Sequence, residues 1–185
     1  ENAISMANSS QTYGVRASGA PKLNEDWSFP FQLEGAHQLD FGDNPNDYQT
    51  WYTHASLAAQ FKKLQLGIGN ETLYSDQGRG FSTPLATLHA FNGWADSFLA
   101  ATPADGLNDI YVWTGGTLPG EIGFKFIYHD FESERTRRDL GQEYDFVLNR
   151  KLGNHWSALI KFAHHDHDSG LPDVTRFWGQ VAFKF

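Results

Sequence analysis

The chain has 185 residues and a formal net charge of −8, and its composition is 40% hydrophobic and 15% aromatic. This composition excludes an intrinsically disordered chain, and no apolar run reaches the length of about 18 residues that a membrane-spanning helix needs. The acidic balance and scattered basic residues exclude nucleic acid as the expected partner, and the absence of cysteine excludes disulfides and thiolate chemistry.

Segments in which apolar and polar residues alternate recur along most of the chain, with turn residues between them. Such alternation sends successive side chains to opposite faces of a strand. We expect nine strands, at residues 12–19, 27–39, 48–61, 64–74, 109–118, 121–131, 142–151, 155–164 and 174–185. Pro30 lies inside the second of these. Because proline cannot donate to a sheet ladder, we expect a bulge or a barrel rim there.

In each expected strand one face is apolar and the other carries polar or charged residues. This pattern predicts an all-β fold, an antiparallel transmembrane β-barrel whose apolar face meets lipid and whose other face lines water. We treat residues 1–185 as a single barrel domain. The last strand is the clearest example, because it ends the chain on an aromatic residue as the closing strand of an outer-membrane barrel does. We expect its apolar side chains to serve membrane insertion by the barrel-assembly machinery: Phe177, Val181, Phe183 and Phe185.

The expected connections alternate in length. Short turns at 61–64, 118–121 and 152–155 alternate with longer segments at 41–47, 75–108, 132–141 and 165–173. Outer-membrane barrels have tight periplasmic turns and larger outer loops, and single-chain bacterial barrels have an even number of strands. Nine strands are odd, so we expect this chain to be the C-terminal part of a larger, even-stranded barrel that an upstream segment or a second chain completes.

Two stretches carry a family resemblance. The segment GFSTPLATLHAFNGWADSF at 80–98, followed by TPADGLNDIYV at 102–112, resembles the signature loop and strand of alginate-export-type outer-membrane proteins, as do the TRFW segment at 175–178 and the terminal Phe185. The resemblance covers residues 11–185 and corresponds to the C-terminal half of that family. It implies a large barrel in the bacterial outer membrane, among lipid and lipopolysaccharide, that lets a polar or anionic solute or a polysaccharide pass.

Ionisable side chains on the expected inner faces are the candidates for lining the lumen: Arg16, Glu34, His54, Glu71, Lys125, Glu143, Asp145, Lys161, Arg176 and Lys184. The family's named exporter has a strongly basic lumen suited to a polyuronate, whereas an anionic polymer would meet both signs of charge here. Two interpretations remain. These side chains form opposed basic and acidic rows that determine the selectivity of the pore, or they have no role and are simply tolerated because the lumen is filled with water.

The expected connection at 75–108 is long and too apolar for a floppy loop. Leu85, Leu88, Phe91 and Leu99 fit a short amphipathic helix after Pro84 that could dock inside the barrel mouth. The alternative is a cap on the barrel rim. The candidate residues for constriction are Phe81, Leu85, Leu88, Phe91, Trp94 and Phe98.

The cluster at 164–168 alternates histidine and aspartate, which gives weak metal candidates in His164, Asp166 and Asp168. Strand alternation separates neighbouring side chains, and no distant ligand pair completes a site, so we expect a solvated outer loop and no metal or other cofactor. A calcium bridge from the two aspartates to lipopolysaccharide phosphates is a variant of the metal hypothesis.

No catalytic motif supports an enzyme: the sequence has no nucleophile elbow, no P-loop and no zinc-protease motif. The main alternative from another class is a soluble or surface-exposed β-barrel ligand-binding module. Alternation separates an apolar face from a polar face but does not say which one points inward, so in this alternative the aromatic faces would turn inward as a core. Aromatic residues near the expected strand ends favour the membrane barrel, whose interfaces carry aromatic girdles.

Overall fold

The computed structural model describes residues 7–83, 92–98, 102–168 and 170–185, and the regular structure in these ranges is β-sheet. The main sheet contains β1 (Ser10–Gly19), β2 (Trp27–Ser28), β3 (Phe31–Asp40), β4 (Gln49–Phe61), β5 (Leu64–Leu73), β8 (Leu107–Leu118), β9 (Ile122–Glu132), β10 (Asp139–Leu152), β11 (Trp156–Asp166) and β12 (Val174–Phe183). A separate hairpin consists of β6 (Ser75–Asp76) and β7 (Arg79–Gly80). Within these ranges no helix is long and apolar enough to cross a membrane.

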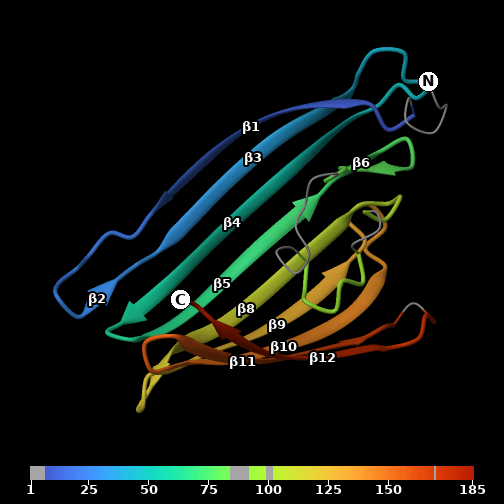
Figure 1. The fold of residues 1–185 in the computed structure, drawn as a ribbon. Coiled ribbons are helices and arrows are strands. Elements are labelled where there is room, and N and C mark those ends of the chain that lie inside the picture. The colour runs from blue at the N-terminus through green and yellow to red at the C-terminus, as the bar shows by residue number, and fades with distance from the viewer. Residues whose placement is uncertain (1–6, 84–91, 99–101, 169) are drawn as a thin grey trace.

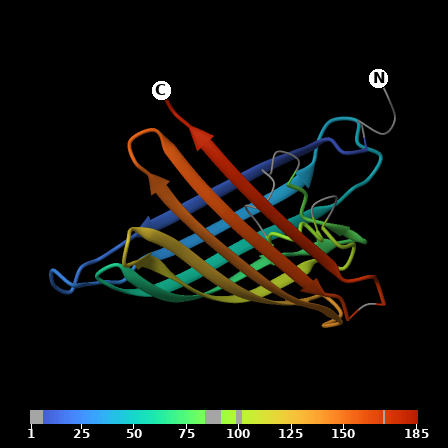
Figure 2. The same ribbon diagram turned by 60° about the horizontal axis from the view of Figure 1, so that its bottom comes forward.

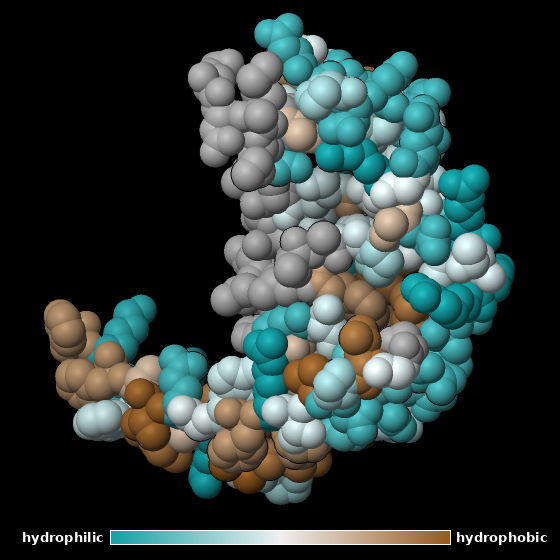
Figure 3. Space-filling view, turned by 90° about the vertical axis from the view of Figure 1, so that its right-hand side faces the viewer, coloured by the Kyte–Doolittle hydropathy of each residue, from teal (hydrophilic) through white to brown (hydrophobic). Residues whose placement is uncertain are grey.

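The long strands follow one another in the sheet as they do in the chain. Their order is β1-β3-β4-β5-β8-β9-β10-β11-β12, each antiparallel to its neighbour, and β2 pairs with β4 beside β3. The sheet curves into a trough (Figures 1 and 2), and a view from one end gives a C-shaped outline (Figure 3). In the described residues β1 and β12 do not pair with each other, so the trough has two free edges.

The two faces of the trough differ in polarity. Large apolar side chains are exposed on the convex face, among them Val15, Leu66, Trp51, Phe177 and Phe183. Most of the buried polar and charged side chains, among them Glu71, Asp109, His129, Glu143 and Asp145, lie on the opposite, concave face. An apolar outer band around a polar interior is the pattern of a membrane barrel. It does not fit the soluble module, in which the aromatic faces would form the core.

The connections divide by length between the two ends of the trough. The turns at 62–63, 119–121 and 153–155 join strands at one end, and the segments at 41–48, 74–106, 133–138 and 167–173 join them at the other. The terminal strand β12 ends beside Trp156, at the short-turn end, whereas Ser10 of β1 pairs with Asp40 at the long-connection end. The three short turns and the four longer segments that the sequence predicted lie at opposite ends, but the 20–30 connection between β1 and β3, which contains β2, is long and lies at the short-turn end.

One strand that was expected to be continuous is interrupted in the structure. The segment at 27–39 is divided at Phe29 and Pro30 into β2 and β3. Pro30 has no N–H to donate, but its carbonyl still accepts the Ala58 N–H at 2.8 Å, which keeps the broken strand against β4. The β6–β7 hairpin was not expected from the sequence.

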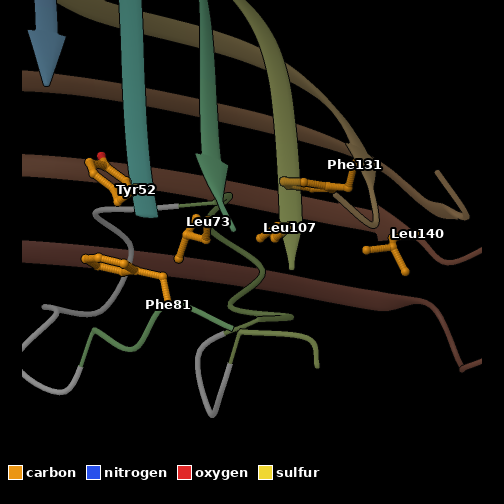
Figure 4. Close-up of a cluster of buried hydrophobic side chains, with 6 residues drawn as sticks. All are labelled: Tyr52, Leu73, Phe81, Leu107, Phe131 and Leu140. Carbon is orange, nitrogen blue, oxygen red and sulfur yellow. The ribbon is translucent and has the colours of Figure 1, made fainter. Parts of the chain in front are cut away.

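A cluster of buried apolar side chains lies towards the long-connection end: Tyr52, Leu73, Phe81, Leu107, Phe131 and Leu140 (Figure 4). Phe81 follows the β6–β7 hairpin, and its ring centroid lies 5.5 Å from that of Tyr52 on β4. The cluster therefore fixes the start of the 81–106 connection against the sheet, at the edge of the polar site described next.

Candidate functional site on the concave face

A belt of ionisable side chains crosses the concave face. Glu71 on β5 is in register with Asp109 on β8, and Glu143 on β10 is in register with both His129 on β9 and His165 on β11. All five are buried. Buried charged groups are costly unless they are paired and hydrogen-bonded, so their neighbours determine whether this arrangement is stable.

His129 is the centre of the belt. Its Nδ1 lies 2.9 Å from Asp109 Oδ1, and its Nε2 lies 3.6 Å from Asp145 Oδ2. An imidazole that carries a proton on each nitrogen is a donor on both sides. His129 therefore lies between two carboxylates on different strands, at hydrogen-bond distance from Asp109 but not from Asp145.

The backbone of residues 92–98 docks onto this belt. The Ala95 N–H donates to Glu143 Oε1 at 2.6 Å, and the Trp94 N–H donates to Asp145 Oδ2 at 3.1 Å. Both carboxylates have no exposed surface. Hydrogen bonds to charged acceptors are stronger than neutral ones, so these two carboxylates act as the main anchors of the segment.

Further contacts extend the docked segment to the last two strands. Asp96 accepts a hydrogen bond from Arg176 on β12 at 2.8 Å, and Ser97 Oγ lies 2.7 Å from His165 Nδ1. The ammonium of Lys161 lies 4.4 Å from the centroid of the Trp94 ring, at cation–π distance. Residues 92–98 are thus held by β10, β11 and β12.

The start of the same connection is held on the other side of the trough. Gln38 on β3 donates to the Ser82 carbonyl at 2.9 Å and accepts the Ser82 N–H at 2.8 Å. In the sheet order β3 and β12 lie on opposite sides of the trough. Within this connection, Ser82 and residues 94–97 are therefore held on opposite sides of the concave face.

Two cavities flank a single bridge between the connection and the sheet. Asn92 donates to Glu71 Oε2 at 3.1 Å, and the Tyr52 hydroxyl donates to Glu71 Oε1 at 2.6 Å. A polar cavity of about 300 Å³ and a more apolar one of about 380 Å³ are both lined by these three residues. The polar cavity also contacts His54, Asp109, Tyr111, Lys125 and His129.

The Tyr111 ring, which lines the polar cavity, and the neighbouring Trp113 ring each lie over a glycine. Tyr111 and Trp113 lie on β8, opposite Gly69 and Gly67 of β5. A Cβ added at either glycine would collide with the ring opposite it. The rings therefore occupy the space that side chains at these positions would fill, and they lie against the wall.

This fold and its polarity have a structural counterpart. No family model and no curated protein matches the chain. The crystal structure of the outer membrane protein OprD from Pseudomonas aeruginosa is similar over 95% of this chain, with a TM-score of 0.73 and 15% sequence identity. The chain has the fold of an outer-membrane β-barrel. It spans 52% of that protein's length, so the likeness concerns about half of that barrel.

Most of the residues predicted to line the lumen lie on the concave face by register. Arg16 and Glu34 are paired across β1 and β3, with 3.9 Å between Nε and Oε2, and His54 Nε2 lies 2.7 Å from the Tyr111 hydroxyl. Glu71 and Glu143 belong to the belt, Asp145 lies two residues from Glu143 on the same face of β10, and Lys125 lines the polar cavity. Lys161 and Arg176 contact the docked segment. Lys184 lies beyond the end of β12, at the short-turn end and apart from this cluster.

The residues predicted for constriction are only partly described. Phe81 lies in the apolar cluster, Trp94 contacts Lys161, and the Phe98 ring packs edge-on against Phe131, with 4.9 Å between centroids. Leu85, Leu88, Phe91 and Leu99, with the helix expected there, lie outside the described residues.

The weak metal candidates do not come together. His164 Nδ1 lies 2.8 Å from Thr175 Oγ1, and its strand neighbour His165 points to the opposite face of β11. In the part of the chain that the structure describes, no group of three or more His, Cys, Asp or Glu side chains is arranged to hold a metal ion.

Sequence reasoning missed several members of the site, chiefly Asp109, His129, His165 and Gln38. Alternation carried enough signal for two of them: Asp109 precedes the outward Ile110, and His129 follows the outward Tyr128. His165 lies one residue beyond the expected end of its strand. Gln38 is uncharged, and nothing in the sequence pattern pairs it with Ser82.

Proposed function

We propose that this chain forms part of a porin-like channel in the bacterial outer membrane, through which a polar or anionic solute or a polysaccharide passes without a catalytic step. The observation that carries the proposal is the pairing of an apolar convex face with a charged concave face on one curved sheet. Such a sheet matches lipid on one side and water on the other. The likeness to the OprD fold supports the same conclusion.

The permeant would meet charges of both signs. Lys125, Lys161 and Arg176 lie on the same face as Glu71, Asp109 and the two carboxylates of β10. Rings of charged side chains determine ion selectivity in pores. The narrower proposal, an alginate-type polyuronate, rests on the sequence resemblance; the acidic belt would repel such a polymer, which favours a smaller polar solute.

We further propose that the 81–106 connection narrows this channel. The observations behind this proposal are its two attachment sites, Gln38 on β3 and the side chains of β10, β11 and β12 that contact residues 94–97. A segment attached at both sides of a trough reduces the cross-section that a solute can use. The alternative of a cap on the rim predicts that the segment can be removed without a change in conductance.

A channel also requires a closed wall. An unpaired backbone N–H or C=O costs several kcal/mol in hydrocarbon, so the free edges of β1 and β12 need strand partners. Further strands of the same polypeptide or of a second chain would supply them. We assign Phe177, Val181, Phe183 and Phe185 to recognition by the barrel-assembly machinery and contact with lipid, including lipopolysaccharide, because all four are exposed.

The test is the conductance of the full polypeptide in planar lipid bilayers. Lys161→Glu and Arg176→Glu should shift ion selectivity towards cations, because both remove positive charge from the concave face. Lys62→Glu, in the exposed turn between β4 and β5, is the control and should leave selectivity unchanged. Purified polypeptide that neither inserts nor conducts would refute the channel. Normal conductance with unchanged selectivity in both variants would refute a role for these charges.

A further inference from the structure

A groove on the convex face differs from the rest of that surface. It is an almost wholly apolar hollow of about 480 Å³ that spans β3, β4, β5 and β8. Its apolar lining comprises Phe31, Leu33, Ala55, Leu57, Ile68 and Ile110. Ala55 is exposed and is in register with Leu33 on one side and Asn70 on the other, so a methyl group stands where its neighbours carry longer side chains.

The lining also includes Ser56, Gly69 and Asn70, and the Asn70 side chain is held in a fixed position. The amide nitrogen of Asn70 donates to Asn108 Oδ1 at 2.8 Å and to the Asp109 carbonyl at 3.2 Å, which uses both amide hydrogens. Thr72 also donates to Asn108 Oδ1, at 2.9 Å. Because these bonds fix the amide plane, the orientation of the Asn70 carbonyl oxygen is fixed as well.

That carbonyl oxygen has capacity for a further donor. The Thr72 hydroxyl, which has a single proton and lies closer to Asn108 Oδ1, is 3.3 Å from this oxygen, and an amide oxygen has two lone pairs. Neither amide hydrogen remains for an acceptor in the groove. A ligand in this groove is therefore best matched by a long apolar body that carries an N–H or O–H donor near one end.

We propose that this groove binds one acyl chain of a membrane lipid whose linkage next to the chain supplies an N–H or O–H to Asn70. The proposal rests on the proposed function, because this face meets lipid only in a membrane. Asn70 lies three residues before the end of β5, at the long-connection end of the strand. The linkage would therefore lie towards the outer leaflet and the chain would extend towards the membrane centre, over Ala55 and between Leu57 and Ile68.

The donor requirement makes the proposal specific. An amide-linked chain has an N–H next to the chain, whereas the ester-linked analogue has only acceptors there. One net hydrogen bond corresponds to a difference in affinity of about threefold to tenfold. The groove should therefore prefer an amide-linked chain, while the remainder of the convex face should not distinguish the two.

The experiment measures lipid bound to the full polypeptide in detergent by native mass spectrometry. The probes are a palmitoyl lysophospholipid with an amide-linked chain and its ester-linked analogue. Ala55→Phe should weaken binding of both by about tenfold or more, because it fills the groove. Ala158→Phe is the matched control, since Ala158 is a small residue on the same face of β11, in register with Val181. Asn70→Leu should abolish the preference for the amide and keep binding of the chain.

Several outcomes would overturn the proposal: equal binding of both probes by the unaltered protein, unchanged binding in Ala55→Phe, or equal losses in Ala55→Phe and Ala158→Phe. Ala55→Leu, with the heat-modifiable gel migration of a folded barrel as the folding check, replaces Ala55→Phe if that variant does not fold. Protein that conducts in bilayers but retains neither probe would refute the groove and leave the channel intact. Protein that never inserts would refute the channel first.

Discussion

The Glu143 carboxylate on β10 accepts the backbone N–H of Ala95 at 2.6 Å, although 48 residues separate the two along the chain. The docked segment is therefore held by its main chain as well as by its side chains, and the fit depends on the residues that let this backbone approach a buried carboxylate. Gly93 is the critical one. Its φ is +84°, and an added Cβ would lie 2.5 Å from the Glu143 carboxyl atoms.

Gly93→Ala should therefore detach residues 92–98 from the belt. The substitution adds a left-handed backbone cost of about 1 kcal/mol to a steric conflict with a side chain that has no exposed surface. We expect faster amide hydrogen exchange at Trp94 and Ala95, together with a higher single-channel conductance. Gly78→Ala is the matched control, because Gly78 has a φ of +77° and open space around its Cβ position. Equal effects of the two variants would mean that backbone strain, and not contact with Glu143, controls the segment.

The ion pair between Arg176 and Asp96 should contribute more than a surface pair. The Asp96 side chain is only 3% exposed, and its carboxylate accepts from the guanidinium at 2.8 Å. Arg176→Ala should lower the free energy of unfolding in detergent by about 1–3 kcal/mol, the cost typical of losing a hydrogen bond to a charged group. Arg137→Ala is the control, because it removes an exposed ion pair with Glu132 of nearly the same length, 2.9 Å. It should change the free energy of unfolding by less than about 1 kcal/mol. Urea titrations of both variants measure the difference in the free energy of unfolding. Equal losses in the two variants would mean that Asp96 is as well solvated as Glu132.

The Asn92 side chain should determine whether the two cavities are connected. Its amide reaches Glu71 at 3.1 Å, and both cavities are lined by this pair. Asn92→Ala removes the bridging atoms, so we expect a higher conductance for small ions without a large loss of stability. Asn154→Ala, in the exposed turn between β10 and β11, should leave conductance unchanged. A conductance in Asn92→Ala that equals that of the unaltered protein would show that solute does not use the space beside this bridge.

The sequence predicted the sheet well because strand alternation is a local property. The apolar faces of the terminal strand and of the strand at 64–74 lie where the alternation of Phe177, Val181, Leu66 and Ile68 placed them. The division at Pro30 was expected as a bulge, but its result, two separate strands on β4, depends on the Ala58 contact across the sheet. Alternation assigns a face to each residue and does not say which neighbours meet there.

The candidate site shows the same limit more strongly. Glu143 and Asp145 were placed on the inner face, but their role as acceptors for the backbone of Trp94 and Ala95 depends on a segment about 50 residues away. No periodic pattern encodes such a contact. The one local signal was Gly93, since a glycine in an otherwise bulky stretch can mark a close approach of the backbone to another group.

Gly67 and Gly69 give the polar cavity a property of a different kind. Because the rings of Trp113 and Tyr111 lie over these glycines, the wall of β5 and β8 is one aromatic layer thick, with no second layer of side chains beneath it. The position of these two rings is then determined by two absent methyl groups. Any larger residue at either position would collide with the ring opposite it, so the place of each ring on the concave face depends on the absence of a single carbon atom and on none of the nearby charged groups.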